Sequence, residues 1–71
     1  MSNERVLVVD DEQAIRRFLR VALSSQGYAV VEASSGQEGL SAANSQKPAV
    51  IILDLGLPDM DGVEVIRLLR E

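Results

Sequence analysis

The chain has 71 residues, a formal net charge of −4 and neither cysteine nor histidine. One small domain is expected, without disulfides, thiolate or imidazole metal sites or histidine-based catalysis, so any metal or acid–base chemistry must rest on carboxylates. The negative charge argues against non-specific nucleic-acid binding, and the short apolar runs and absence of a signal-peptide pattern predict a cytoplasmic protein without membrane contact.

The first predicted element is a strand at residues 5–10, an apolar β-branched run that ends in Asp10. Because the run does not alternate, it predicts a strand buried on both faces, as in a parallel sheet. A helix follows, and Gly27 suits the left-handed position just past its end. Its apolar residues recur at three- and four-residue spacing: Ile15, Phe18, Leu19, Ala22 and Leu23.

The second strand is expected at residues 28–33, and a capping box follows it. The Ser35 hydroxyl can accept a hydrogen bond from the Glu38 amide while the Glu38 side chain reaches back. We expect the helix that begins here to run to about Ser45. It must end before Pro48, because the residue preceding a proline avoids the α region.

The third strand candidate, residues 49–54, is the most apolar and ends in Asp54. Gly56 lies in the loop that follows, and Asp61 can cap a third helix, with Glu64 three residues later. The faces of that helix are marked by Val63, Ile66 and Leu69 or Arg70. The order β-α-β-α-β-α with short connections predicts a parallel sheet with right-handed crossovers.

Acidic residues follow two of the three strands: Asp10 and Asp11 after the first, and Asp54 after the third. If these strands are neighbours, the three carboxylates converge at one edge of the sheet, where open parallel sheets bind ligands. Close acids repel unless a cation neutralises them, and Mg²⁺ suits oxygen ligands of high negative charge. A carboxylate beside Mg²⁺ can attack phosphorus and form an acyl phosphate. For a single aspartate, a turn or cap is the simpler interpretation, but three at matching strand ends favour a shared site.

Other motifs fit less well. With Gly62 at the sixth position of a calcium loop, the twelfth residue would be Leu68 instead of the bidentate glutamate. No G-x-x-x-x-G-K-[ST] precedes the third strand, and no G-x-G-x-x-G is present. The sequence therefore does not predict a calcium loop, a nucleotide-binding P-loop or a dinucleotide fingerprint.

The acid pair after Val-Leu-Val-Val, the block Ile-Ile-Leu-Asp54-Leu-Gly-Leu-Pro58-Asp-Met-Asp-Gly62 and their spacing closely resemble response-regulator receiver domains. The segment 12–20, with Asp-Leu-Gly-Leu-Pro-Asp, looks most like the Kdp-type regulators of potassium transport, which carry a winged-helix output domain. The resemblance implies an α/β, flavodoxin-like parallel sheet with helices on both faces and strand order 2-1-3.

The resemblance also implies roles for individual residues. Asp54 matches the phospho-acceptor, Asp11 the direct Mg²⁺ ligand and Asp10 the acid that often acts through a water. The backbone carbonyl of Gly56 would complete the metal site. The implied phosphoryl donor is a sensor histidine kinase, so the chain would be an acceptor and not an enzyme, apart from its own phosphorylation and dephosphorylation. DNA would be contacted only through an output domain that this chain lacks.

By this resemblance, residues 1–71 are a partial receiver domain, the first three of five β-α units. The Ser/Thr after the fourth strand and the Lys after the fifth are missing, so we expect poor phosphoryl labelling and no switching. The alternative function is a truncated, non-signalling module that self-associates through its exposed third strand or docks a kinase. The arginines of the first helix predict either a solvated face or a kinase-docking patch: Arg16, Arg17 and Arg20.

Overall fold

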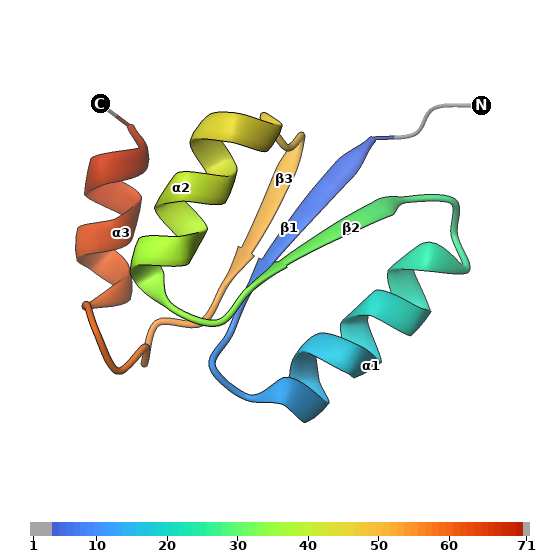
Figure 1. The fold of residues 1–71 in the computed structure, drawn as a ribbon, viewed down its shortest axis with the longest axis horizontal. Coiled ribbons are helices and arrows are strands. Elements are labelled where there is room, and N and C mark those ends of the chain that lie inside the picture. Colours follow the sequence, from blue (N-terminus) through green and yellow to red (C-terminus); the bar gives the residue numbers. More distant parts are fainter. Residues whose placement is uncertain (1–3, 71) are drawn as a thin grey trace.

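The computed structural model describes residues 4–70, so residues 1–3 and 71 of the predicted domain lie outside the described part. Its elements are β1 (Arg5–Val9), α1 (Gln13–Ser24), β2 (Ala29–Ala33), α2 (Gly36–Gln46), β3 (Val50–Leu53) and α3 (Gly62–Leu69). The strands are parallel in the order β2-β1-β3. Helix α1 covers one face of the sheet, and α2 and α3 lie on the other (Figure 1). The predicted element order, strand order and two covered faces are confirmed.

The central strand β1 is the most buried part of the fold. Val6 to Val9 are between 0% and 3% exposed, which confirms the predicted strand with two buried faces. Leu7 and Val9 belong to a core cluster on the α2 and α3 side, together with Ala33, Leu57 and Val65. Side chains alternate along a strand, so Val6 and Val8 face α1. The carboxyl end of β1 therefore lies in the middle of the sheet, between the ends of β2 and β3.

Helix α1 lies on the sheet with no fully buried residue. Of the predicted apolar stripe, Leu19 and Leu23 are half-buried, whereas Ile15 is 40% and Phe18 68% exposed. The side chain of Arg16 is only 16% exposed. An arginine thus occupies part of the inward face that the sequence pattern assigned to Phe18.

The predicted ends of α2 are confirmed in outline. Ser35 Oγ accepts a hydrogen bond from the Glu38 amide at 3.1 Å. The Glu38 carboxylate reaches back one residue further than in a capping box and accepts from the Ser34 amide at 2.8 Å. Lys47, which precedes Pro48, leaves the right-handed helical region by adopting φ 49° and ψ 58°. The helix therefore stops at the proline, as expected.

Helix α3 is capped by Asp61, whose side chain accepts from the Val63 amide at 2.9 Å. Of the residues that were expected to mark its faces, Leu69 lies on the inward side, and Val63 and Ile66 do not. Val65 is 1% exposed and Leu69 packs against the core, while Val63 is 65% and Ile66 41% exposed. Val65 and Leu69, four residues apart, therefore form the inward side of α3, which packs against α2.

Strand β3 lies at one edge of the sheet, next to β1. It is short and apolar, and Val50 at its start is 52% exposed. Such an edge presents unpaired backbone groups to which another strand can add. Among the helices of residues 4–70, none has the length and hydropathy that a membrane-crossing segment requires.

Candidate functional site: an acidic cluster at the sheet edge

The register of β1 and β3 brings their carboxyl ends level. Val9 and Leu53 are paired across the two strands, and the Asp54 amide donates to the Val9 carbonyl at 2.9 Å. The next residue on each strand is an aspartate, Asp10 or Asp54. These two acids therefore leave the sheet side by side.

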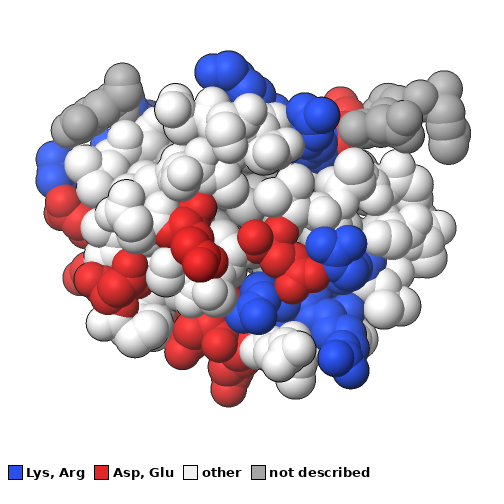
Figure 2. Space-filling model, in the orientation of Figure 1, with Lys and Arg blue, Asp and Glu red and all other residues white. Residues whose placement is uncertain are grey.

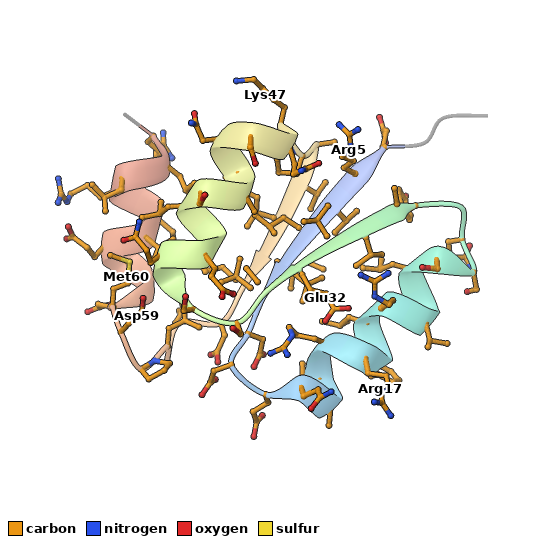
Figure 3. The ribbon with its side chains drawn as sticks, viewed as in Figure 1. Arg5, Arg17, Glu32, Lys47, Asp59 and Met60 are labelled. Carbon is orange, nitrogen blue, oxygen red and sulfur yellow. The ribbon has the colours of Figure 1, made fainter. Side chains whose placement is uncertain are left out.

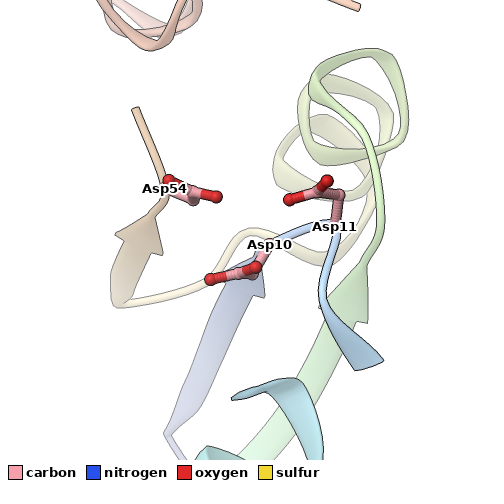
Figure 4. Close-up of side chains that lie close together, drawn as sticks. All are labelled: Asp10, Asp11 and Asp54. Atoms are coloured by element: carbon pink, nitrogen blue, oxygen red, sulfur yellow. The ribbon is translucent and has the colours of Figure 1, made fainter. Parts of the chain in front are cut away.

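Asp10, Asp11 and Asp54 form the acidic cluster. Each offers a carboxylate oxygen, and these oxygens lie within 4.8 Å of one another (Figure 4). Asp11 is exposed, whereas Asp10 and Asp54 are half-buried. The predicted convergence of the three acids is confirmed. Three negative charges at this spacing repel, and a bound cation would offset that repulsion.

Some of the cluster's oxygens already have hydrogen-bond donors. Asp10 Oδ1 accepts from the Glu12 amide at 2.9 Å, and Asp54 Oδ1 accepts from the Gly56 amide at 3.0 Å. In the part of the chain that the structure describes, no donor reaches the Asp11 carboxylate or Asp54 Oδ2. These oxygens can therefore accept a ligand. An all-oxygen donor set with this charge fits Mg²⁺ better than a softer metal.

The loop after β3 is closed tightly beneath the cluster. The Gly62 amide donates to the Leu55 carbonyl at 3.2 Å. A Cβ at Gly62 would lie 2.5 Å from Leu55 Cα, so a side chain cannot fit there without moving the backbone. At Gly56, in contrast, a Cβ would meet only Asp54 Oδ1, at 3.7 Å. Close packing thus explains the glycine at position 62 but not the one at position 56.

The same loop is tied to the start of α2 through Asp59. Its two carboxylate oxygens accept from the amides of Gly36, at 2.8 Å, and Gln37, at 3.0 Å. These two amides hold the pKa of Asp59 below its usual 3.8. Asp59 and Met60 lie together beside α2 (Figure 3). Sequence reasoning missed this contact, because the partners are more than twenty residues apart and carry no local signal.

The predicted basic patch on α1 is largely occupied by an ion pair. Arg16 Nε donates to Glu32 Oε1 at 3.0 Å, and Arg20 Nε donates to Glu32 Oε2. The hydrogen bond from Arg20 and then that from Arg16 lower the pKa of Glu32, although partial burial opposes them. Figure 2 shows acidic and basic side chains next to one another over α1. Arg17 points away from the sheet (Figure 3), and the Arg20 side chain is 47% exposed despite its ion pair, so the choice between a solvated face and a docking patch stays a prediction.

A separate groove of about 410 Å³ lies between α2 and α3. It is lined by Leu40, Ala43, Asn44, Lys47, Leu68 and Leu69. The lining residues come from α2, from Lys47 just past its end and from the last residues of α3, and none of them is acidic. The acidic cluster lies at the opposite ends of the strands, so the groove is not part of that site.

Known proteins share both the sequence and the fold. Residues 6–71 match the response regulator receiver domain. The KDP operon transcriptional regulatory protein KdpE of Escherichia coli is 62% identical over 66 residues, and the alkaline phosphatase synthesis transcriptional regulatory protein PhoP of Bacillus subtilis is 46% identical over 69. These alignments cover 93% and 97% of this chain but 29% of each relative. The response regulator TrrA of Thermotoga maritima, solved in complex with Mg²⁺–BeF, superposes with a TM-score of 0.89 and 39% identity over 94% of this chain and 58% of that one.

Proposed function

This chain belongs to the response-regulator receiver family, and from that premise we propose that Asp54 is its phosphoryl acceptor. Receiver domains accept phosphoryl groups and are not enzymes that act on a separate substrate. The observation that carries the proposal is the convergence of Asp54 with Asp10 and Asp11, with carboxylate oxygens within 4.8 Å of one another. One oxygen of Asp54 is held by the Gly56 amide, which leaves the other for the reaction.

The proposed metal is Mg²⁺, held by the carboxylates of Asp10, Asp11 and Asp54 and completed by the backbone carbonyl of Gly56. Two observations support this choice. The donor set consists of oxygens only, and TrrA, which is 39% identical to this chain, was solved in complex with Mg²⁺–BeF. When bound, Mg²⁺ would offset the negative charge of the carboxylates and of the incoming phosphoryl oxygens.

The proposed phosphoryl donor is the phosphohistidine of a sensor histidine kinase. Asp54 Oδ2 attacks the phosphorus, so that an O–P bond forms while the N–P bond breaks. The electron pair of the broken bond stays on the imidazole nitrogen. The Asp54 side chain points toward Asp11 (Figure 4), so the phosphoryl group would arrive at the acidic cluster. Without a cation, the transferred group would meet uncompensated negative charge.

Titration calorimetry with Mg²⁺ tests the metal site. We expect binding to the parent chain and at least a tenfold loss of affinity in Asp11→Asn and Asp54→Asn, since each removes a charged ligand. Asp61→Asn is the matched control, because it removes the same charge from a residue outside the cluster and keeps a capping side chain. Equal binding by all four proteins would contradict the proposed metal site.

Intact mass spectrometry after incubation with acetyl phosphate tests the acceptor. Any phosphoryl label is expected to require Mg²⁺, to be absent from Asp54→Asn and to persist in Asp61→Asn. Labelling of Asp54→Asn to the extent of the parent chain would show that another residue is the acceptor.

A narrower proposal concerns the regulated genes. The identity to the KDP operon regulator is 62%, against 46% to the alkaline phosphatase synthesis regulator, which supports control of potassium-transport genes through an output domain that binds DNA. The test is a hybrid protein in which this chain replaces the matching 66-residue segment of E. coli KdpE. We expect the hybrid to retain regulated transcription of the KDP operon and a hybrid carrying the PhoP segment to lose it. Loss in both hybrids, with both proteins folded, would contradict the narrower proposal.

The extent of the domain and its association are also proposals. Residues 1–71 would correspond to the first three of five β-α units, in agreement with the 58% of the TrrA chain that is covered.

Edge strand β3, with Val50 52% exposed, supports the second candidate function, a module that self-associates through this strand. Sedimentation should then show an oligomer that dissociates on dilution, and a monomer at all concentrations would contradict it. A cytoplasmic location, expected from the sequence, remains part of the proposed function.

A further inference from the structure

Arg16 connects the ion pair on α1 with the backbone of the acidic cluster. Its Nε donates to Glu32 Oε1 at 3.0 Å, and its Nη1 donates to the Asp10 carbonyl at 2.7 Å. The side chain is only 16% exposed, so this contact is sheltered from bulk water. One guanidinium group therefore bridges β2 and the carboxyl end of β1.

Asp10 is held at three points. Its amide donates to the Ala33 carbonyl at 3.0 Å, its Oδ1 accepts from the Glu12 amide, and its carbonyl accepts from Arg16. The carbonyl belongs to the peptide group that joins Asp10 to Asp11. Because a peptide group is planar, a hydrogen bond to its oxygen orients the amide of the next residue. Arg16 thus restrains the peptide from which Asp11 projects.

Arg20 stabilises the acceptor on which Arg16 depends. Its Nε donates to the second oxygen of Glu32, and its Nη2 donates to the Val30 carbonyl at 3.2 Å. Arg16 and Arg20 are one helical turn apart, so both reach the same carboxylate from α1. Only Arg16, however, also contacts the acidic cluster's backbone.

We propose that Arg16, held in place by Glu32, is a positioning residue that sets the orientation of Asp11 for cation binding. The metal part of this inference rests on the proposed function, whereas the restraint on the Asp10–Asp11 peptide does not. Removing a residue that holds a metal ligand in place through a hydrogen bond commonly changes metal affinity by about tenfold or more. The chain offers a control on the same helix, since Arg17 carries the same charge but points away from the sheet (Figure 3).

The charge of Arg16 and its proposed positioning role predict opposite changes in Mg²⁺ affinity when the residue is replaced. Removing a cation near three carboxylates should strengthen the attraction of Mg²⁺ to them. Loss of positioning should weaken Mg²⁺ binding instead. The direction of the change in affinity therefore separates the two explanations.

The experiment compares Arg16→Lys, Arg16→Ala and Arg17→Ala with the parent chain by Mg²⁺ titration calorimetry. Lysine keeps the charge but has a single nitrogen, which cannot span both Glu32 and the Asp10 carbonyl. We expect about tenfold weaker binding in both Arg16 variants and parent-like or slightly tighter binding in Arg17→Ala. Parent-like or tighter binding in Arg16→Lys would overturn the inference.

A measurement without metal keeps the test independent of the proposed function. In ¹H–¹⁵N spectra of the metal-free proteins, the Asp11 and Glu12 amide signals should shift in Arg16→Lys and Glu32→Gln but not in Arg17→Ala. Circular dichroism identifies any variant that fails to fold, and Glu32→Gln, which keeps the shape of the side chain, then carries the comparison. If the parent chain binds no Mg²⁺, the proposed metal site fails, and the amide shifts alone decide whether Arg16 positions Asp11. Unchanged shifts in both Arg16→Lys and Glu32→Gln would overturn the positioning role.

Discussion

The Asp59 carboxylate accepts a hydrogen bond from the backbone amide of Gly36 at 2.8 Å and so joins the loop after β3 to the first residue of α2. A second hydrogen bond, from the Gln37 amide, uses the other carboxylate oxygen. Both amides belong to the first turn of α2, where backbone donors have no partner within the helix. Asp59 therefore connects the loop that begins at Asp54 to helix α2.

Asp59→Ala should destabilise the fold, because two amides at the start of α2 lose their acceptor and a negative charge leaves the positive end of the helix. We expect the melting temperature to fall by about 5 °C. The melting temperature of Asp59→Asn should fall by less, since the side-chain amide oxygen of asparagine can still accept one hydrogen bond. Thermal unfolding followed by circular dichroism measures both changes, and equal melting temperatures for all three proteins would contradict the role of this contact.

The contribution of Asp59 should depend on pH. Hydrogen bonds from Gly36 and Gln37 hold its pKa below 3.8, so the folded protein binds the proton less tightly than the unfolded chain does. The stabilisation is therefore fully present above the unfolded pKa and is lost as the pH falls through the lowered folded pKa. The difference in melting temperature between the parent and Asp59→Asn should shrink between about pH 5 and about pH 2. A constant difference over this range would show that the charge of Asp59 does not matter.

Gly39→Ala tests the close approach of α2 to β1. Alanine favours a helix interior by about 1 kcal/mol over glycine. Its Cβ, however, would lie 2.9 Å from Val9 Cγ2 and 3.0 Å from Val9 Cγ1, so α2 would be pushed away from the sheet. Overpacking of this kind costs about 1–3 kcal/mol, and we expect a net loss in the free energy of unfolding. The exposed position Ser41 supplies the control in urea unfolding, where Ser41→Ala should stabilise by up to about 0.5 kcal/mol.

Leu7→Ala should remove much of the stability of the fold. Leu7 is 1% exposed and lies in the core cluster between β1 and α2. Its truncation leaves a cavity and should lower the free energy of unfolding by about 2–5 kcal/mol. Val63→Ala, at a residue that is 65% exposed, should change it by less than about 0.5 kcal/mol. Chemical denaturation measures both, and similar effects at the two positions would mean that the core does not lie where the structure shows it.

Short-range patterns in the sequence were enough to predict the elements, their parallel direction and several helix ends, and the resemblance to receiver domains implied the strand order. Ser35 and Asp61 cap their helices, and Gly27 adopts φ 93° past the end of α1, because caps and turns depend on residues within about four positions. The grouping of Asp10, Asp11 and Asp54 followed from the rule that parallel strands present their carboxyl ends at one edge. Their roles with Mg²⁺ and phosphate remain predictions.

One local expectation was only partly met. Glu64 was expected to take part in the cap of α3, but its carboxylate pairs with Arg67 one turn later. An ion pair between residues three apart on a helix competes with a capping box for the same carboxylate. Both choices are local, so the sequence allows either and the arrangement of the side chains decides.

Only the tertiary structure decided the contacts between residues that are distant in the sequence. Arg16 turns inward and bridges Glu32 and the Asp10 carbonyl, and Asp59 accepts a hydrogen bond from the Gly36 amide. These contacts join residues up to 23 positions apart. The sequence by itself determined the three strands, their parallel direction and the three acids that follow β1 and β3, because these depend on local hydrophobic spacing and on the crossover rule. The strand order was expected only from the resemblance to receiver domains. The orientation of those acids depends on strand register and on how each helix is rotated against the sheet, and these are set by packing across the whole fold.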